Sequence, residues 1–397
     1  MRRATEGPRC VATSRRRRVV VRIACIIAMM AGVWLLMPQR GYALSAMGGG
    51  ASENGDARCP SSRVLRPGTH GVRLDAETVH ATTKTSVRSN ASASYAGALN
   101  SLMTGDGTYV YYAEQSVDPN EGPVLRKVSR VRADGSGYKC IYEGGAGDFI
   151  SDLKLSDNRL VVSMGGNIVS MKTDGGDAHV IVAAASGYPR GARFAVDAGK
   201  VFYPTIADSG AWEIRSCTVD GSASSRVYSG NTGQGEVSPQ IEGATSGKVV
   251  FMTGEQQPSS NTYLYSVLSV PADGGDAIEI GRTLNNRVAV SGGRVYIMDG
   301  TLESMQADGK SRYRICQIPG NGYSPIYNIG DGVAYVGMGK TMWRVSLSSG
   351  DSTSLGKYNG VGQMEIVDGQ VYIHYGIEGA IRKVDASLAD QGYFRQS

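Results

Sequence analysis

A pattern of about forty residues recurs from Gly107 to the C-terminal end, and this repetition constrains the fold more than any other feature. The clearest copy runs from Val367 to Ser387 and reads VDGQVYIHYGIEGAIRKVDAS. It begins with a tight-turn signal at Asp368-Gly369, continues with a β-branched and aromatic strand, and reaches a second strand, Ile381 to Val384. Because strands recur without a helical pattern between them, the repeat indicates all-β units that stack on one another.

Seven copies can be aligned on the turn residue that precedes the first clear strand. Gly or Asn occupies this position in every copy, and both adopt the positive φ that a two-residue hairpin connection needs. The second and third residues after it are apolar or aromatic, so we expect both faces of this strand to be covered. The aligned residues are Gly107, Asn158, Gly199, Gly247, Gly293, Gly332 and Gly369.

Each copy contains signals for four antiparallel strands. The second strand leads in most copies to Asp-Gly, a strong hairpin signal, and a short outer strand follows. A further strand, such as Ile150 to Leu155, precedes each copy. The seven units average about 43 residues, as is typical of propeller blades. We therefore predict an all-β, seven-bladed β-propeller, with six blades as the alternative if the first copy, with its insertion from Ser116 to Pro123, is a decoration.

The segment before the repeats predicts export. Arg15 to Arg18 precede an apolar run from Val19 to Met37 that only Arg22 interrupts, and small residues follow near Gly41. These features fit a cleavable signal peptide, and the run is also long enough for a retained signal-anchor helix. In both cases the arginines place the propeller outside the cytoplasm, either secreted or anchored to the cell membrane.

Net charge separates this segment from the rest of the chain. The chain carries +5 overall, while nine arginines and one glutamate give residues 1 to 43 a charge of +8 and leave about −3 for the remainder. A slightly acidic body lacks the basic surface that nucleic-acid binding requires. We therefore predict no nucleic-acid partner.

Residues 44 to 95 are rich in Gly, Ser, Ala, Thr and Arg, and no aromatic residue other than Tyr95 falls in them after position 43. Such a segment cannot bury enough apolar surface to offset the entropy lost on ordering. The predicted organisation is a signal peptide or signal-anchor at 1 to 43, a disordered linker at 44 to 95, and a β-propeller at 96 to 397.

Residue types that carry chemistry are scarce in the repeats. Cys140, Cys217 and Cys316 lie at different phases of different copies, so we interpret them as small buried residues and not as disulfide partners. The only histidines there are His179 and His374, and no cysteine and histidine cluster indicates zinc. No catalytic motif for a nucleophile or phosphate site is present. We expect no metal, no cofactor and a noncatalytic function.

Units of the form Gly-x-Val-Tyr-Ile, then Ile-x-x-Val-x-x-Asp-Gly, resemble bacterial propeller domains of unknown function that are similar to low-density-lipoprotein receptor-related (YWTD) β-propellers, and less closely the TolB propeller. The resemblance covers about residues 97 to 397. No copy contains a YWTD tetrad, since Val110-Tyr111-Tyr112 and Val201-Phe202-Tyr203 lack the Trp-Thr-Asp. The resemblance implies a secreted or surface-exposed binding propeller with no assigned ligand.

Tyrosine is abundant, with 21 residues against five Phe and three Trp. Exposed tyrosines on propeller loops can stack on sugars or anchor a partner protein. Most tyrosines fall in predicted strands, and those near Gly-rich connections are the ligand-binding candidates. They are Tyr188, Tyr323, Tyr327 and Tyr358.

Three functions follow as hypotheses. The first is an exported or membrane-anchored binding module for a protein, peptide or cell-wall glycan. The second is a carbohydrate-active hydrolase or lyase, which would need two of the chain's carboxylates to converge at a defined separation. The third is a structural or sensor ectodomain held by a retained anchor. The carboxylates considered for the second are Asp197, Asp208, Glu213, Glu236 and Glu242.

Overall fold

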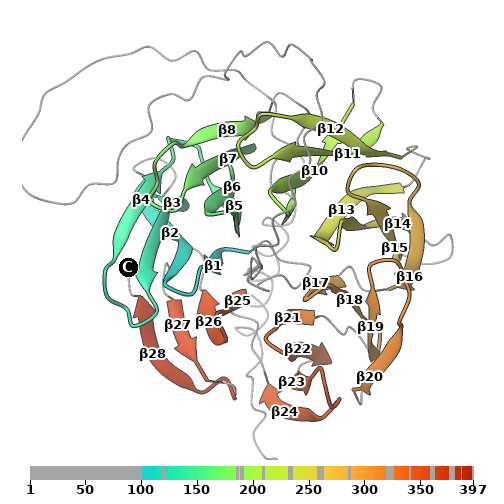
Figure 1. Ribbon diagram of the computed structural model, residues 1–397. Coiled ribbons are helices and arrows are strands. Elements are labelled where there is room, and N and C mark those ends of the chain that lie inside the picture. The colour runs from blue at the N-terminus through green and yellow to red at the C-terminus, as the bar shows by residue number, and fades with distance from the viewer. Residues whose placement is uncertain are drawn as a thin grey trace, which may run out of the picture. The chain divides into compact units, whose positions relative to one another are not determined.

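The strands of the protein form a ring of seven sheets (Figure 1). The computed structural model describes residues 101–395 except 119–121, 185–186, 188–191, 208–210, 231–235, 257–262, 285–287, 319–325, 339–340, 358–362, 375–380 and 386. Each sheet has four antiparallel strands that are consecutive in the sequence. The prediction of a seven-bladed propeller is confirmed, and the six-bladed alternative is wrong. The predicted signal segment and linker lie outside the described residues.

The blades are numbered 1 to 7 in chain order, and each runs from its innermost to its outermost strand. The strands of blades 1 to 4 are β1 (Met103–Gly105), β2 (Tyr109–Asp118), β3 (Gly122–Arg132), β4 (Lys139–Glu143), β5 (Ile150–Ser156), β6 (Arg159–Met164), β7 (Asn167–Lys172), β8 (His179–Val182), β9 (Ala195–Asp197), β10 (Lys200–Ile206), β11 (Trp212–Thr218), β12 (Ser224–Ser229), β13 (Glu236–Thr245), β14 (Lys248–Gln256), β15 (Tyr263–Pro271) and β16 (Ile278–Thr283). Those of blades 5 to 7 are β17 (Val288–Ser291), β18 (Arg294–Met298), β19 (Thr301–Gln306), β20 (Tyr313–Gln317), β21 (Ile326–Gly330), β22 (Val333–Met338), β23 (Thr341–Ser346), β24 (Ser352–Lys357), β25 (Gln363–Val367), β26 (Gln370–His374), β27 (Ile381–Val384) and β28 (Asp390–Arg395).

The innermost hairpin of each blade closes at the turn residue on which the copies were aligned. In six blades the connection has two residues, and both have positive φ, as in Asp157-Asn158 (47° and 61°) and Asp368-Gly369 (48° and 76°). These are the dihedral signs of a type I′ turn, whose twist matches that of the flanking strands. The predicted turn position is therefore confirmed in every blade.

The insertion in the first copy lengthens a hairpin of blade 1. Strands β2 and β3 stay paired as far as Val117 with Pro123 and Asp118 with Gly122. The first copy is therefore a full blade, and its insertion extends one of its hairpins. A β-bulge between Glu114 and Gln115 accommodates the added length.

The second Asp-Gly turn joins the third and fourth strands, and its glycine also packs on the preceding blade. Gly175 has φ +89°, and a Cβ added to it would lie 2.0 Å from the carbonyl oxygen of Ile141 in β4. The Asp174 carboxylate accepts a hydrogen bond from the amide of Gly176 at 2.8 Å. Both residues of this turn therefore have structural roles, as the sequence predicted.

The hydrophobic core is divided among the blade interfaces. One cluster joins Tyr111 and Val128 of blade 1 to Leu153 and Leu160 of blade 2, and all four are almost fully buried. Similar clusters occupy the other interfaces. Strand residues that face either side of a blade are therefore covered, as the apolar pairs in the repeats predicted.

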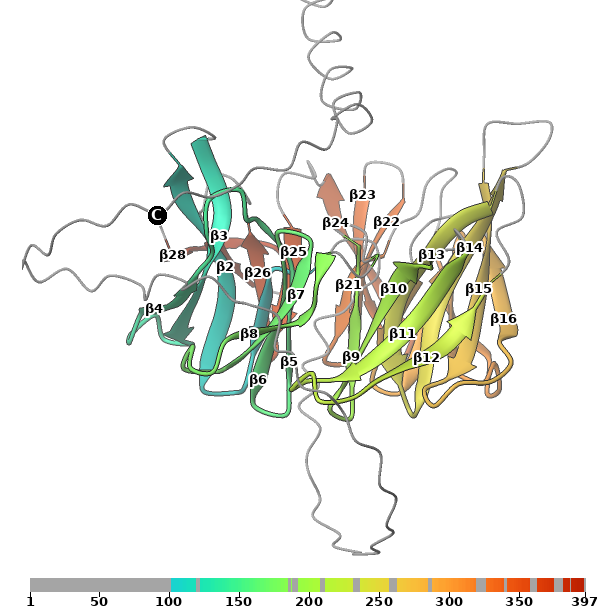
Figure 2. The same ribbon diagram turned by 90° about the horizontal axis from the view of Figure 1, so that it is seen from above.

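The two faces of the ring carry different kinds of connection (Figure 2). On the turn face, inner hairpins have two residues in six blades, and third-to-fourth strand connections have five or six. On the opposite loop face, connections range from two residues between β6 and β7 to twelve between β8 and β9. The turn face is therefore uniform from blade to blade, and the loop face varies.

Candidate functional site

Polar and charged side chains gather on or just before the innermost strands of blades 6, 7 and 1 to 4. We call this set the inner belt, and six of its seven residues are buried although the surrounding core is apolar. Three of them, Lys154, Asn328 and Glu365, occupy the same place in their copies, three residues before the inner turn. The inner belt consists of Ser101, Asp152, Lys154, Arg193, Glu242, Asn328 and Glu365.

An ion pair joins blades 3 and 4 within the inner belt. The Arg193 guanidinium nitrogen Nη1 lies 3.0 Å from both carboxylate oxygens of Glu242. The Glu242 side chain has no exposed surface, and that of Arg193 is 13% exposed. A buried carboxylate is stable only with such a partner, so the pair fixes the two innermost strands to one another.

Lys154 continues the inner belt across blades 1 to 3. Its ammonium group contacts the Asp152 carboxylate and lies 3.9 Å from the centre of the Phe194 ring. Asp152 also accepts a hydrogen bond from the amide of Ser101 at 3.0 Å. Burial lowers the pKa of Lys154 to about 8, while the Asp152 charge acts in the opposite direction.

Glu365 connects blade 7 to blade 1. Its Oε1 accepts hydrogen bonds from the amide of Leu102 at 2.9 Å and from the side chain of Gln363 at 2.8 Å. Its Oε2 lies 3.2 Å from the hydroxyl oxygen of Ser101. Burial raises the pKa of Glu365 to about 8, although the Leu102 and Gln363 donors lower it.

The belt contacts run from blade to blade. Asn328 of blade 6 donates to the carbonyl of Met364 in blade 7 at 2.9 Å, and blades 7, 1, 2, 3 and 4 follow through the contacts above. Perturbed pKa values can mark a catalytic site, but buried ion-pair networks perturb them as well. Since at least one contact crosses each of these five blade interfaces, the inner belt joins neighbouring blades.

Both described histidines contact backbone carbonyls. His374 is buried, and its Nε2 donates to the carbonyl oxygen of Ala113 in blade 1 at 2.8 Å. His179 has Nδ1 2.9 Å from the carbonyl oxygen of Asp177 and Nε2 3.0 Å from that of Asp220. Neither histidine is arranged as a general base beside a nucleophile.

The carboxylates considered for a hydrolase are bound to separate partners. Glu242 pairs with Arg193, and Glu213 lies 3.1 Å from Arg215 on the same strand, β11. Asp197 is 3.4 Å from the amide of Gly247 in the inner turn of blade 4. Asp208 lies outside the described residues, and Glu236 begins β13.

Of the four candidate tyrosines, one has a described position. Tyr327 belongs to strand β21, so its assignment to a loop is corrected. It is partly buried against a cluster that includes Tyr335 and Met364, and a β-bulge between Ile326 and Asn328 surrounds it. Tyr188, Tyr323 and Tyr358 lie outside the described residues. In the sequence they fall between β8 and β9, between β20 and β21, and between β24 and β25.

Exposed apolar side chains occur where strands of blades 3 and 4 end at the loop face. Ile206, the last residue of β10, is 43% exposed and pairs across the hairpin with Trp212. Leu284, which follows β16, is 59% exposed. Tyr138 and Tyr313 are also exposed, but they lie at the other end of their blades, next to the turns before β4 and β20.

The cysteines differ from the sequence prediction in one respect. Cys217 and Cys316 are free thiols, as predicted, and burial raises the pKa of Cys217 to about 12. Cys140 is disulfide-bonded, so its interpretation as an unpaired residue is wrong. The partner of Cys140 is neither Cys217 nor Cys316, the cysteines of the other repeats, since both are free.

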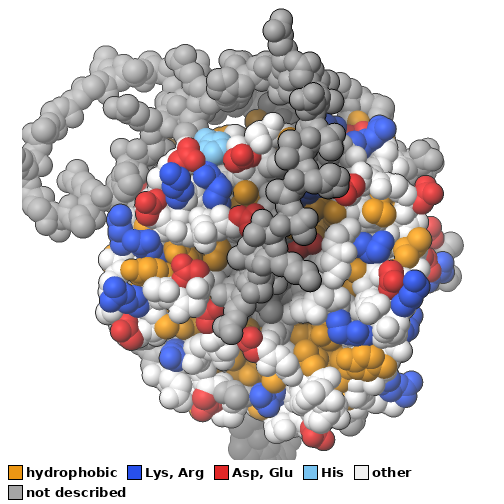
Figure 3. All heavy atoms as spheres, viewed as in Figure 1, with side chains coloured by type: hydrophobic (Ala, Val, Ile, Leu, Met, Phe, Trp, Pro, Cys, Tyr) orange, Lys and Arg blue, Asp and Glu red, His pale blue; other side chains and the backbone are white. Residues whose placement is uncertain are grey.

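No group of three or more potential metal ligands occurs among the residues that the structure describes. Nor does any helix in that part of the chain have the length and hydrophobicity required to cross a membrane. On the face shown in Figure 3, acidic and basic side chains are interspersed, without a broad region of one sign.

Comparisons with known proteins find only distant structural similarity. No protein-family model matches the chain, and no curated protein sequence matches it. Among solved structures, a chain of the mitotic checkpoint complex is similar with a TM-score of 0.45 and 12% identity, covering 82% of this chain and 99% of that one. A puromycin hydrolase has a TM-score of 0.48 and 12% identity, covering 76% of this chain and 54% of the hydrolase.

TolB from Acinetobacter baumannii is also among the matches, with a TM-score of 0.37, 12% identity and 65% coverage of each chain. The resemblance to receptor-related propellers stays a prediction.

Proposed function

We propose that the protein is an exported, noncatalytic β-propeller whose loop face binds a protein, a peptide or a cell-wall glycan. The observation that carries this proposal is the difference between the two faces. Connections of two or three residues and of five or six residues close the blades on the turn face, while connections of two to twelve residues join strands at the loop face. Variable connections on a rigid scaffold are where proteins place recognition residues.

Side chains of suitable chemistry support the choice of the loop face. Tyr188, Tyr323 and Tyr358 fall in the sequence between strands whose facing ends lie at that face. The exposed Ile206 and Leu284 add apolar surface at its edge over blades 3 and 4. Aromatic and apolar groups of this kind supply much of the binding energy at protein and sugar interfaces.

The disulfide at Cys140 supports the proposed location outside the cytoplasm. Structural disulfides persist in oxidising compartments and are rare in the reducing cytosol. The arginine-rich, apolar segment at residues 1 to 43 provides the route, as a signal peptide or as a retained membrane anchor.

A binding screen of the full chain tests the proposal. The chain is applied to an array of cell-wall glycans and used to capture cell-surface proteins and peptides. We expect the double variant Tyr323→Ala/Tyr358→Ala to weaken binding by about tenfold or more, the usual effect of losing interface anchors. The matched control is Tyr313→Ala, which removes a tyrosine that is 46% exposed near the turn face.

Equal loss of binding in both variants, or binding to no ligand by the folded chain, would overturn the assignment. Shortening of a bound glycan during incubation would instead support the hydrolase or lyase hypothesis. Unchanged glycan length agrees with a noncatalytic module.

A further inference from the structure

Cys140 lies on the outside of the ring. It belongs to β4, the outermost strand of blade 1, and no further strand pairs beyond β4 among those that the structure describes (Figure 1). Its backbone pairs with Ser129 of β3, and the next two residues, Ile141 and Tyr142, are buried in the core. The strand is therefore held firmly, while the side chain of Cys140 is only half-buried at the rim.

The three cysteines in the blades differ in their bonding state. Cys140 is disulfide-bonded, whereas Cys217 and Cys316 are free. Cys316 is an informative comparison, because it also lies half-buried on an outermost strand, β20. A half-buried position on an outer strand is therefore not sufficient for the bond, and Cys140 differs in having a partner within reach.

The cysteines outside the blades supply the candidates for that partner. The chain has six cysteines, and the remaining three are Cys10, Cys25 and Cys59. The chain divides into two compact units, residues 1–56 and 57–397. Cys59 falls in the unit that contains the blades, whereas Cys10 and Cys25 fall in the other unit. The division therefore favours Cys59 as the partner.

The proposed export leads to the same cysteine, and the inference rests on that part of the proposed function. Cys10 precedes the apolar run, on the side that the arginines retain in the cytoplasm, and Cys25 lies within the run. Neither can meet a propeller outside the cytoplasm while the segment spans the membrane, and cleavage near residue 43 removes both. Cys59 is on the same side as the blades in each case.

We propose that Cys59 and Cys140 form a disulfide, which fastens the segment before the blades to the outer rim of blade 1. A thiol–disulfide oxidant of the compartment outside the cytoplasm would form the bond by exchange. The two thiols lose two electrons and two protons, and the disulfide of the oxidant is reduced to a dithiol. The bond closes a loop that begins before β1 and ends in β4, so it encloses the first three strands of blade 1.

The bond changes the point at which an anchored protein is held. Without it, the tether runs from the end of the apolar run at Met37 to Ser101, the first described residue. With it, the tether ends at Cys59 and is about a third as long, since an extended chain spans at most about 3.5 Å per residue. A retained anchor would therefore hold the ring by the rim of blade 1.

Peptide mapping tests the bond directly. The exported protein is recovered from outside the cytoplasm, treated with iodoacetamide without reductant, and digested with trypsin. Cleavage after Arg58 and Lys139 releases the peptides 59–63 and 140–154. We expect these two peptides to be joined in a protein that migrates as a monomer, and to separate when a reductant is added.

Cys59→Ser provides a second readout, since it leaves Cys140 without its partner. We expect labelling of Cys140 by iodoacetamide to rise by about tenfold or more, because a thiol reacts and a disulfide does not. Cys316→Ser is the matched control. It removes a half-buried cysteine from another outermost strand and should leave Cys140 unlabelled.

The assignment would be overturned if Cys140 is joined to Cys10 or Cys25, is joined to a second chain, or is labelled in the unmodified protein. A disulfide at Cys140 that persists in Cys59→Ser would overturn it as well. Failure of the proposed binding is a separate result, because an exported chain that has the bond and binds no ligand contradicts only the binding. A chain found in the cytoplasm with Cys140 free would contradict both the export and the bond.

Discussion

At the scale of single residues, the repeated Asp and Gly illustrate how position determines role. The Asp found in most of the outer turns resembles a candidate acid or metal ligand, but Asp174 accepts a hydrogen bond from a backbone amide two residues ahead. Some of the glycines that follow are needed only for their positive φ. Others are also needed because a neighbouring blade packs directly against them. Gly135 and Gly175 represent these two cases.

Substitution of these glycines separates the two roles. Gly175→Ala is expected to destabilise the protein strongly, because its φ is +89° and the new Cβ would meet the Ile141 carbonyl oxygen at 2.0 Å. Gly135→Ala is the control, since its φ is +85° but no atom lies within 4 Å of the new Cβ. We expect about 1–2 kcal/mol of conformational cost in the control, from urea unfolding, and a clearly larger loss in Gly175→Ala. Equal losses would contradict the packing role.

The cysteines should differ in reactivity. Thiolate, not thiol, reacts with iodoacetamide, and burial raises the pKa values of both free cysteines. In the native protein without reductant, we expect slow labelling of the partly exposed Cys316, slower labelling of the buried Cys217 and none of Cys140. Peptide mapping by mass spectrometry measures each rate. Labelling of Cys140 before reduction would show that it is not held in a disulfide.

At the scale of strands and blades, hairpins form from local signals, but blades join through residues that are distant in sequence. Arg193 lies just before β9, and Glu242 lies on β13, 49 positions later. The ion pair stabilises the fold only while both side chains are present. A lone buried carboxylate has no solvent to replace a missing partner.

A double-mutant cycle on this pair tests that statement. Arg193→Met leaves Glu242 buried without its ion pair, and we expect a loss of about 3–5 kcal/mol in the free energy of unfolding. The double variant Arg193→Met/Glu242→Met removes both charges, and it should be more stable than Arg193→Met alone. Urea unfolding of the four proteins gives the coupling. Additive losses would show that the two side chains act independently.

The strands were predictable from the sequence because turn residues fix their positions. Positive φ at Asn158 or Gly369 restricts the residue types that fit, and the hydrophobic pattern sets which side chains are covered. The inner belt was not predicted, because a polar residue within a strand usually marks a solvent-facing side. Glu365 meets Leu102, 263 positions away, only after the ring has closed. One sequence signal for the inner belt was available. A polar residue stands three positions before the inner turn in three copies, at Lys154, Asn328 and Glu365.

Tyr327 shows a second limit of sequence reasoning. The preceding Pro319-Gly320-Asn321-Gly322 indicates a loop, and Tyr327 was assigned to it by proximity. Strand β21 nevertheless begins at Ile326, and pairing with β22 accommodates Tyr327 through a bulge. A bulge shifts the alternation of side chains and has no reliable sequence pattern.

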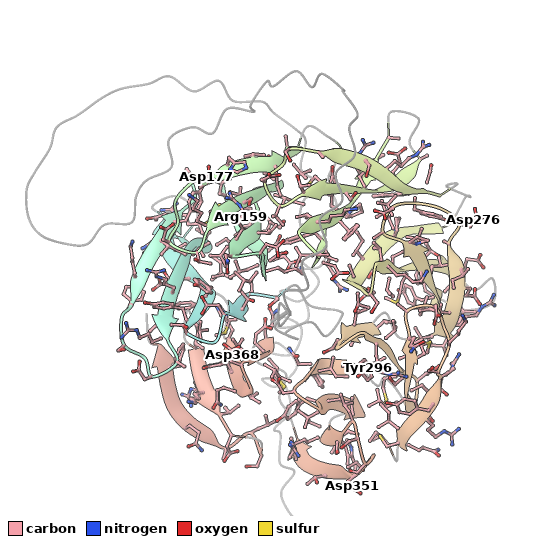
Figure 4. The ribbon with its side chains drawn as sticks, viewed as in Figure 1. Arg159, Asp177, Asp276, Tyr296, Asp351 and Asp368 are labelled. Atoms are coloured by element: carbon pink, nitrogen blue, oxygen red, sulfur yellow. The ribbon has the colours of Figure 1, made fainter. Side chains whose placement is uncertain are left out.

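At the scale of the whole molecule, contacts between inner turns repeat around parts of the turn face. The Asp368 carboxylate accepts a hydrogen bond from the amide of Gly107 in blade 1 at 3.1 Å, and that of Asp331 accepts one from Gly369 in blade 7 at 2.9 Å. Asp368 lies at the inner edge of the ring (Figure 4). These bonds add polar contacts between blades 6, 7 and 1 on the turn face.

Asp368→Asn tests the electrostatics of this set. Burial and the charges of Asp106 and Asp331 raise the pKa of Asp368, so its stabilising contribution is lost as the pH rises above its ordinary range. The amide keeps an acceptor for Gly107 and removes the repulsion. We expect thermal unfolding temperatures equal to or above those of the unmodified chain at neutral pH, with a smaller gain near pH 4. A uniform loss at both pH values would mean that the charge itself is needed.

Each blade takes all four strands from consecutive residues, so the ring closes without exchanging a strand, and this determines the order in which the molecule can be completed. Synthesis from the amino end completes blade 1 early, with one side of Met103 and Tyr112 still uncovered. The covering residues, Val367 and Tyr372, are among the last to arrive. Truncation near the carboxyl end would therefore leave an apolar surface of blade 1 exposed. The core of the first blade is complete only when the last blade is present.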